Sequence, residues 1–358
     1  MTASEPALPM EVLKRFTAGL LMHVGVPQED ADLIADALVS ADARGMQSHG
    51  LVRLPVYVRR IVAGGARPGI SGTIVHETAT TVLLDGQDGI GQVIAARAMH
   101  EAIRKARDGG AGVVGVRRSN HFGEGAYYVA RAITEGMIGL ITTSGSPNMP
   151  YWGGREPVLG TLPLAVGVPA RDEMPIVLDL AFGTVSKGKV IQAAAKGERI
   201  PSDWAVDSNG DATDDPQAVL DGGWILPIGG YKGSGLILIM EILSAVLTGA
   251  RFATEVYDLY GDHARPQALG HFAFAIDVEA FMPLDELTER VDRLIRMIKA
   301  TGPDGELLMP GEREQRLFAA RQAAGIPLPA DTIRALGEVA REVGLPITKE
   351  GREFLVTS

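Results

Sequence analysis

Two histidines of this chain stand beside other side chains that could take part in chemistry. His49 follows Ser48, and in a continuous helix His49, Arg53 and Tyr57 would lie four residues apart on one face. An imidazole exchanges a proton near neutral pH, and a guanidinium binds a carboxylate through two parallel hydrogen bonds. This spacing predicts a site for a small carboxylate, with Ser48 and Tyr57 as further polar groups. The alternative is a solvated helix face that Ser48 caps.

The second histidine, His121, lies in the segment 119–125, after a β-rich run and before a segment with helical character. Loops that leave a strand and enter a helix N-terminus are typical places for ligands. The alternative is an ordinary turn in which Asn120 and His121 bond to the local backbone. Either His49 or His121 could therefore be the proton donor of a catalytic site.

Three glycine-rich segments could approach a ligand closely. Residues 229–235 place four glycines around Lys232 before an apolar run, which favours a bound phosphate or carboxylate, with a hinge as the alternative. Residues 183–190 are close to a phosphate-binding loop, but Val190 stands where a hydroxyl must hold Mg²⁺. A nucleoside-triphosphatase is therefore the weaker hypothesis, although Lys187 and Lys189 could still hold an anion.

The third glycine segment, 89–94, has only two of the three glycines of a dinucleotide fingerprint, because Ile94 replaces the last one. The next β-rich run ends in Arg117 and Arg118, and no acid is there to bind a ribose hydroxyl. An ordinary strand–helix turn is the favoured interpretation, so the sequence argues against a Rossmann fold.

The composition excludes several classes of protein. The chain has 358 residues, 46% of them hydrophobic, a formal charge of −10 and no cysteine. The high apolar fraction excludes a disordered chain, and the lack of cysteine excludes disulfides, a thiolate nucleophile and cysteine-bound metals. The acidic balance argues against nucleic acid and anionic membranes as partners. The sequence also lacks the histidine pairs and aspartate-rich loops of metal sites, so no metal is expected.

No targeting or membrane signal is expected. Residues 1–16 are too acidic for a signal peptide. The apolar run 236–247 is interrupted by Glu241 and is too short to span a bilayer, so it predicts a buried helix. We therefore expect a cytoplasmic protein.

Hydrophobic periodicity predicts helices near both chain ends and strands between them. Helices are expected at residues 12–24, 29–44, 48–62, 95–107 and 285–301, and in a last helix that Asp331 caps. Strands are expected at residues 81–84, 112–116, 139–142, 176–178 and 271–276. This order lacks a regular βαβ rhythm, so it predicts an α/β protein with a mixed sheet flanked by helices. The predicted parts are helical ends at 1–72 and 285–358 around an α/β body at 73–284.

Nine ordered segments of the chain resemble the malate/L-lactate dehydrogenase family, which also includes sulfolactate and ureidoglycolate dehydrogenases and cyclic-imine reductases. The matching segments are Ser48-His49-Gly50 with Arg53, Ser119–Gly123, Trp152–Pro157, Leu159–Thr161, Leu178–Ala181, Gly229–Gly233, Leu247–Ala250, Gly270–Phe272 and Pro310–Glu312. The resemblance implies a non-Rossmann fold with a mixed, largely antiparallel sheet, a helical domain formed from both chain ends, and a homodimer.

The resemblance also implies roles for individual residues. Ser48, His49, Arg53 and Thr161 would meet the substrate. NAD or NADP would contact the stretch from residue 306 to 312 and a further set of residues: His121, Phe122, Gly123, Glu124, Gly125, Asp179, Leu180, Ala181, Lys232, Pro310, Gly311 and Glu312. The chain departs from the family pattern at Leu162, where asparagine is usual, and at Phe182-Gly183, where two hydroxyl residues are usual.

Together these features predict reversible hydride transfer between nicotinamide and a small 2-oxo or 2-hydroxy acid. Arg53 would hold the substrate carboxylate, and a histidine would transfer the proton. His49 is favoured slightly because Ser48 and Arg53 lie beside it in sequence, and His121 stays a candidate. The alternative within the family is reduction of a cyclic imine, such as piperideine- or pyrroline-2-carboxylate.

Overall fold

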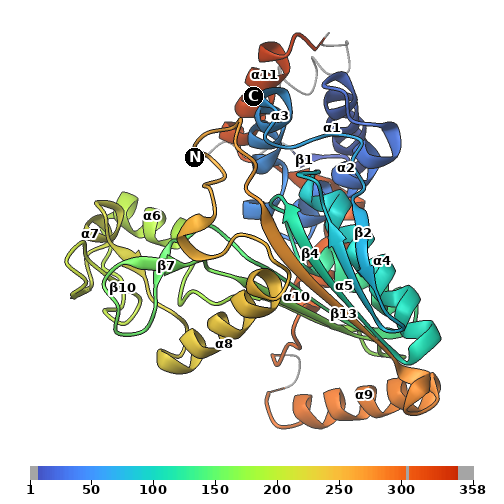
Figure 1. Cartoon of the computed structure of the whole chain (residues 1–358). Helices are drawn as coiled ribbons and strands as arrows, with labels where there is room; N and C mark the ends of the chain where they lie inside the picture. Colours follow the sequence, from blue (N-terminus) through green and yellow to red (C-terminus); the bar gives the residue numbers. More distant parts are fainter. Residues whose placement is uncertain (1–6, 304–305, 346–358) are drawn as a thin grey trace.

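Seven strands form the central sheet of the computed structural model, which describes residues 7–303 and 306–345 (Figure 1). In spatial order the strands are β2 (Thr73–Glu77), β3 (Thr81–Asp85), β4 (Ala111–Ser119), β13 (Leu269–Asp277), β5 (Met137–Thr143), β8 (Pro163–Val168) and β9 (Ile176–Ala181). Only β3 and β4 run parallel, and the other neighbouring pairs are antiparallel. The predicted mixed, largely antiparallel sheet and its five predicted strands are confirmed.

Eleven α-helices lie in the described part of the chain. They are α1 (Met10–His23), α2 (Gln28–Ala43), α3 (Leu54–Ala63), α4 (Gly91–Gly109), α5 (Ala126–Thr134), α6 (Lys187–Lys196), α7 (Pro216–Leu220), α8 (Tyr231–Glu241), α9 (Leu284–Lys299), α10 (Glu312–Ala324) and α11 (Ala330–Glu342). A π-helical turn (Ile242–Val246) continues α8.

The sheet buries one face under α4 and α5. Buried and partly exposed positions alternate along the first part of β4, where Gly112, Val114 and Val116 are buried. These side chains and those of the neighbouring strands share one apolar core with the two helices. The parallel pair β3–β4 is joined through α4, so the carboxyl end of β4 leads directly into the segment that carries His121.

A second core joins the two ends of the chain. Residues of α1, α2 and α3 pack against Ile326, Leu336 and Val339 from the C-terminal part. The short strands β1 (Ala7–Leu8) and β14 (Ile326–Pro327) pair beside this core. Figure 1 shows α11 next to α3, whereas α9 lies at the opposite end of the sheet. The boundaries at residues 73 and 285 stay a prediction, and residues 346–358 of the last predicted part lie outside the described residues.

A smaller lobe projects from the sheet on the side of α6 and α7 (Figure 1). It contains a three-stranded sheet of β10 (Ala205–Val206), β11 (Ala212–Thr213) and β12 (Trp224–Ile225). Its core includes Val190, Ile200 and Val219. Beside it lies the pair β6 (Met149–Pro150) and β7 (Pro157–Leu159).

The helix predicted at 236–247 forms, but the prediction that it is buried is wrong for the single chain. Leu236 is 52% exposed and Leu247 is 65% exposed, together with Ile239, Ile242 and Val246 between them. Leu236, Ile239, Ile242 and Val246 recur every three or four positions, and with the adjacent Leu247 they form the α8 apolar face. Nothing in the described part of the chain covers them. Among the described residues, no helix combines the length and the apolar character that a membrane crossing requires.

Asp331 does not cap the final helix as predicted. The cap position is Pro329, and Asp331 lies in the first turn of α11. An acidic side chain in the first turn still interacts favourably with the helix dipole. Asp331 Oδ1 also accepts a hydrogen bond from Arg334 at 2.6 Å.

Candidate active site

The segment that carries His49 is not one continuous helix, so this part of the helix predicted at 48–62 is wrong. Two short 3-10 turns, Gln47–His49 and Leu51–Arg53, precede α3. The Asp42 carboxylate, from α2, accepts a hydrogen bond from the Leu51 backbone N–H at 2.7 Å. A Cβ atom at Gly50 would lie 2.2 Å from this carboxylate, so only glycine fits at the bend. Pro55 lies in the first turn of α3 and causes no kink there.

The fold brings the two predicted histidines together. The rings of His49 and His121 are stacked, with centroids 5.9 Å apart and planes inclined by 12°. His49 Nδ1 is 3.0 Å from Ser48 Oγ, and His121 Nδ1 is 2.6 Å from Tyr57 Oη. Ser48, His49, Tyr57 and His121 therefore form one cluster, although their segments lie about seventy residues apart in sequence.

Arg53 lies beside this cluster. Its Nε donates a hydrogen bond to the Ser48 carbonyl at 2.6 Å, and its guanidinium lies over the Tyr260 ring, 5.3 Å from the centroid. These two contacts orient the guanidinium through its Nε and its flat face. This arrangement suits the capture of a carboxylate next to the histidines.

Burial keeps both histidines neutral at neutral pH. Burial, together with the smaller effect of the Arg53 charge, lowers the pKa of His49 to about 4. Burial also lowers the pKa of His121 well below its ordinary value, with smaller contributions from His49 and Arg53. A neutral imidazole is ready to accept a proton. An anion bound between Arg53 and the rings would raise both pKa values.

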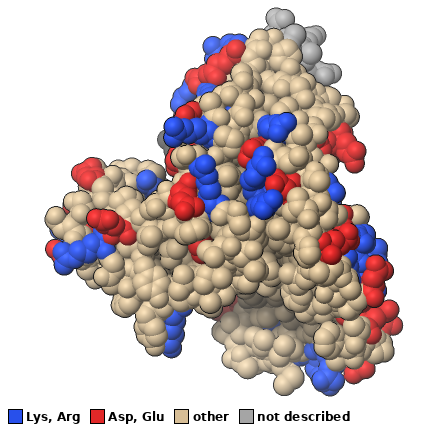
Figure 2. Space-filling view, viewed as in Figure 1, with Lys and Arg blue, Asp and Glu red and all other residues tan. Residues whose placement is uncertain are grey.

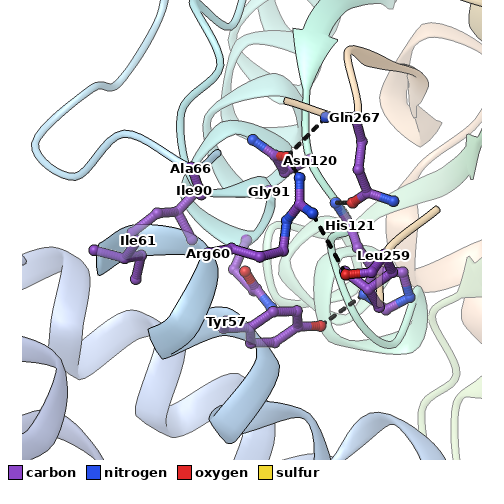
Figure 3. A pocket seen from close by; sticks show the side chains of 11 residues that line it. Tyr57, Arg60, Ile61, Ala66, Ile90, Gly91, Asn120, His121, Leu259 and Gln267 are labelled. Atoms are coloured by element: carbon purple, nitrogen blue, oxygen red, sulfur yellow. Dashed lines mark hydrogen bonds between the residues drawn. The ribbon is translucent and has the colours of Figure 1, made fainter. Parts of the chain in front are cut away.

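Asn120 and Gln267 hold the loop that carries His121. The Asn120 amide donates to the carbonyls of Asp88 and Gly89 at 3.0 and 2.9 Å. Gln267 Oε1 accepts a hydrogen bond from the His121 backbone N–H at 3.1 Å. Asn120 thus bonds to backbone groups, as the alternative interpretation predicted for this residue, but His121 turns its ring into the cluster. Figure 3 shows these side chains converging beside Tyr57.

The glycine pair at residues 89 and 91 serves this loop. Gly91 begins α4, and a Cβ atom there would lie 2.2 Å from the carbonyl oxygens of both Asn120 and His121. The glycine therefore lets the start of α4 approach the loop. The interpretation of this motif as a strand–helix turn agrees with this position.

Sequence reasoning missed Arg60, one of the largest fully buried side chains. Its guanidinium donates to the carbonyl of Arg265 at 2.6 Å and to Asn120 Oδ1 at 3.4 Å. It thereby ties the segment 257–267 to the His121 loop. Its position three residues after Tyr57 was the available signal, because residues at this spacing share a helix face.

Several predicted cofactor residues meet at the N-terminus of α5. Asp179 Oδ2, from β9, accepts a hydrogen bond from the Ala126 N–H at 2.7 Å. Glu124 is buried and pairs with Arg44 at 3.0 Å, and its Oε2 has no hydrogen-bond partner among the described residues. Burial raises the pKa of Glu124 to about 7 and that of Asp179 to about 6. Gly123 and Gly125 complete this turn, and the Phe122 ring packs against Tyr128.

The other predicted residues occupy separate positions. The Pro310 carbonyl accepts a hydrogen bond from the Val177 N–H of β9. Residues 310–312 therefore lie at the edge of the strand that also provides Asp179, Leu180 and Ala181. The Glu312 carboxylate is already paired with Lys299 and Arg316. Thr161 bonds to Asn148, and Lys232 is exposed at the start of α8. Within residues 7–303 and 306–345, neither hydrogen-bonds to the histidine pair.

The departures from the family pattern have a packing explanation. Leu162 is 1% exposed and Phe182 is 4% exposed, and they share a small apolar core with Met149, Leu159 and Ile237. The two apolar side chains therefore replace polar groups with a packed cluster under α8. In the described part of the chain, no group of three histidine or acidic side chains is arranged to hold a metal ion.

A model of one protein family, described as malate/L-lactate dehydrogenase, matches residues 8–337. The chain belongs to this family. It is 37% identical over 348 residues to the malate dehydrogenase of Pyrococcus horikoshii, covering 94% of this chain and 96% of that protein. It is 33% identical to the ureidoglycolate dehydrogenase (NAD(+)) of Escherichia coli O157:H7, covering 91% and 93%. It is also 33% identical to the (2R)-3-sulfolactate dehydrogenase (NADP(+)) of Chromohalobacter salexigens, covering 88% and 93%.

Two solved structures of the family are similar over nearly the whole chain. The sulfolactate dehydrogenase of Methanocaldococcus jannaschii superposes with a TM-score of 0.89 at 37% identity, covering 95% of this chain and 98% of that one. The Δ1-piperideine-2-carboxylate reductase of Pseudomonas syringae superposes with a TM-score of 0.84 at 30% identity, covering 94% and 100%. The mixed α/β architecture agrees with both.

Proposed function

We propose that this family member is an NAD(P)-dependent oxidoreductase that interconverts a small 2-hydroxy acid and the corresponding 2-oxo acid. The stacked His49–His121 pair beside Arg53 is the observation that carries the proposal. It joins a proton-transfer group to a carboxylate-binding group in one place. The relatives named for malate, ureidoglycolate and sulfolactate support the same substrate class.

Residues at the N-terminus of α5 fit a dinucleotide. Glu124 Oε2 is a buried acceptor with no partner in the described residues, and a ribose hydroxyl or a carboxamide N–H could supply the missing donor. Gly123 has a positive φ, and a Cβ atom at Gly125 would lie 2.6 Å from Ala165, so this close-packed turn depends on both glycines. The loop 121–125, Asp179 and residues 310–312 would hold the cofactor without a Rossmann fingerprint, and exposed Lys232 would bind a phosphate. When bound, the nicotinamide supplies or takes up the hydride.

The roles of the protein groups follow from their chemistry. Arg53 holds the substrate carboxylate, with Ser48 and Thr161 as further substrate contacts. One ring of the His49–His121 pair takes the hydroxyl proton during oxidation and returns it to the carbonyl oxygen during reduction. His49 keeps the slight preference because Ser48 and Arg53 contact it or its segment directly.

A spectrophotometric assay tests the function. The purified protein should change the absorbance of NADH or NADPH with one or more 2-oxo acids of a panel that includes oxaloacetate, pyruvate and sulfopyruvate. Binding of Mg-ATP without any response to NADH or NADPH would contradict the proposal and favour a phosphate-binding protein instead.

The same assay tests the second candidate, reduction of a cyclic imine. The similarity to the piperideine-carboxylate reductase structure favours this alternative specifically. An imine such as piperideine-2-carboxylate carries the carboxylate that Arg53 would bind, so the panel includes it. Turnover of the imine together with inert 2-oxo acids would replace the main proposal by this one.

We also propose a homodimer and a cytoplasmic location. The α8 apolar face carries no charge, because Glu241, the charged residue of the stretch 236–247, is buried. A second copy of the same face would cover it without introducing unpaired charges, as in a symmetric dimer. Cell fractionation tests the location.

A further inference from the structure

Arg53 has no acidic partner in the part of the chain that the structure describes. Its Nε donates a hydrogen bond to the Ser48 carbonyl at 2.6 Å, which leaves the two terminal nitrogens of the guanidinium as donors. Figure 2 shows basic and acidic side chains next to one another over the helical chain ends. Arg53 differs from these groups, because within residues 7–303 and 306–345 no Asp or Glu side chain forms an ion pair with it. Its charge is therefore available to an anion from outside the chain.

The ring of Tyr260 covers one face of this guanidinium. The Arg53 Cζ atom lies over the ring, 5.3 Å from its centroid, which is within the range of a cation–π interaction. Tyr260 is 58% exposed, so its ring stands at the surface and is not part of an apolar core. A ring on the face of a guanidinium leaves the edge of the group open, and a carboxylate binds at that edge through two parallel hydrogen bonds.

The Tyr260 segment, which we define as residues 257–267, is anchored by Arg60. The Arg60 guanidinium donates hydrogen bonds to three backbone carbonyls of this segment: those of Leu259, Asp262 and Arg265, at 3.4, 3.5 and 2.6 Å. Figure 3 shows this guanidinium directed at Leu259, the neighbour of Tyr260 in sequence. The Leu259 side chain is itself buried in the core of the two chain ends. The exposed ring therefore projects from a segment whose backbone is held on both sides of it.

Two further contacts restrict the same segment. A Cβ atom at Gly65 would lie 2.0 Å from the His263 carbonyl oxygen, so the segment packs directly on the backbone that follows α3. The Tyr260 backbone N–H donates a hydrogen bond to Asp258 Oδ1 at 2.6 Å and closes the turn before the ring. Arg53 immediately precedes α3, which carries the anchoring arginine. One helix therefore fixes the guanidinium and also the segment that covers it.

We propose that Tyr260 is a positioning residue for the substrate carboxylate, because its anchored ring holds the Arg53 guanidinium in one plane. The inference rests on the proposed function, in which Arg53 binds that carboxylate. A guanidinium held between the Ser48 carbonyl and the Tyr260 ring points its terminal nitrogens in one direction before the substrate arrives. The substrate then loses less binding free energy to the ordering of a flexible side chain. The ring also keeps water from one face of the cation, which strengthens its attraction for an anion.

The test compares Tyr260→Leu, which removes the aromatic face, with Tyr260→Phe, which keeps it. In the turnover assay Tyr260→Leu should raise the KM of the 2-oxo acid by about 3- to 30-fold, the range of a cation–π interaction. The kcat and the KM of the nicotinamide cofactor should change less. Tyr260→Phe should stay within about twofold of the wild type, because the ring face is retained. Phe281→Ala is the control, since Phe281 is 78% exposed at the other end of β13.

A double variant tests whether the ring acts through Arg53. In the Arg53→Gln background there is no guanidinium to hold, so Tyr260→Leu should cause no further loss of kcat/KM. A further loss as large as the one in the wild-type background would overturn the proposal. Equal losses in Tyr260→Phe and Tyr260→Leu would also overturn it, because the hydroxyl and not the ring face would then be responsible.

Binding of oxamate separates this inference from the proposed function. Oxamate resembles a 2-oxo acid but is not reduced, and titration calorimetry with and without NADH or NADPH measures its affinity. The wild type and Tyr260→Phe should bind it equally, and Tyr260→Leu should bind it about 3- to 30-fold more weakly. An unchanged affinity in Tyr260→Leu, or a wild type that binds no oxamate, would overturn the proposal. The expected affinities without turnover of any 2-oxo acid or imine would refute the proposed function alone.

Discussion

Each ring of the stacked pair has one nitrogen engaged by a hydroxyl, from Ser48 for His49 and from Tyr57 for His121. Because both rings are neutral and share a site, replacing each one separately identifies the proton-transfer group. The His49→Ala or His121→Ala variant that removes this group should lower kcat by about 10²- to 10⁴-fold. His76→Ala, on the exposed strand β2, serves as the control in the same assay. Near-full kcat in both site variants would exclude the pair.

A second residue-scale prediction concerns the buried carboxyl of Asp42 under the bend at Gly50. Burial raises its pKa to about 7, against the hydrogen bond from Leu51 and the Arg321 charge, which lower it. Between pH 3.8, the ordinary pKa of the group, and about pH 7, folded Asp42 therefore keeps a proton that the unfolded chain has already lost. The associated stability is fully present below the lower value and is lost as the pH rises through the upper one.

Asp42→Asn keeps an acceptor for the Leu51 N–H but does not titrate. Its free energy of unfolding relative to the wild type should therefore rise across this window by up to about 4 kcal/mol. Urea unfolding at pH 5 and pH 8 covers the upper part of this window and should show about 3 kcal/mol of the rise. Asp32→Asn, on the exposed side of the same helix, is the control. Parallel pH profiles for Asp42→Asn and the wild type would contradict the prediction.

At the scale of elements, the approach of α4 to the His121 loop depends on the missing side chain of Gly91. Gly91→Ala would place a methyl group 2.2 Å from two carbonyl oxygens, so the loop must move away from α4. We expect a loss of stability of about 1–3 kcal/mol together with a fall in kcat/KM. Thermal unfolding and steady-state kinetics measure these two effects.

Gly19→Ala is the matched control for that change. Gly19 lies in α1 with open space around its Cβ position, so alanine there should be neutral or stabilise the helix by up to about 1 kcal/mol. Equal effects of the two substitutions would show that close packing at residue 91 is unimportant.

The elements also show what sequence patterns can predict. The periodic helices α1, α2 and α9 and the β-branched strands agree with prediction, because a single burial pattern determines each of them. The helix start at Ser48 was wrong because the decisive contact, from Asp42 to the Leu51 N–H, is tertiary. The contacts of Arg60 and Gln267 were missed for the same reason: neither side chain belongs to a motif, and only the fold brings them to the His121 loop.

At the scale of the whole molecule, the error in predicting α8 as buried leads to a test of assembly. Apolar residues all along 236–247 suggested burial, and the single chain leaves the α8 apolar face uncovered. If a second copy covers this face, Leu247→Glu should convert a dimer into a monomer, because it would place two charges in an apolar interface. Light scattering coupled to size-exclusion chromatography measures the mass.

Val62→Glu is the control for assembly. Val62 is 63% exposed at the end of α3, and it is separate from the α8 apolar face. This variant should keep the mass of the wild type. A wild type that is monomeric at micromolar concentration, or a dimeric Leu247→Glu variant, would refute the proposed interface.

The joining of both chain ends in one core has a consequence for biosynthesis. α11 packs against α3 and against the turn that ends in Arg53, and β1 pairs with β14. Domains generally form as units while the ribosome releases the chain from its N-terminus. The turns that carry His49 and Arg53 are made first, but their supporting partner α11 is made only after β13, the strand at the centre of the sheet. A nascent chain can therefore complete its sheet before it can hold a substrate, and activity should begin only once α11 has been made.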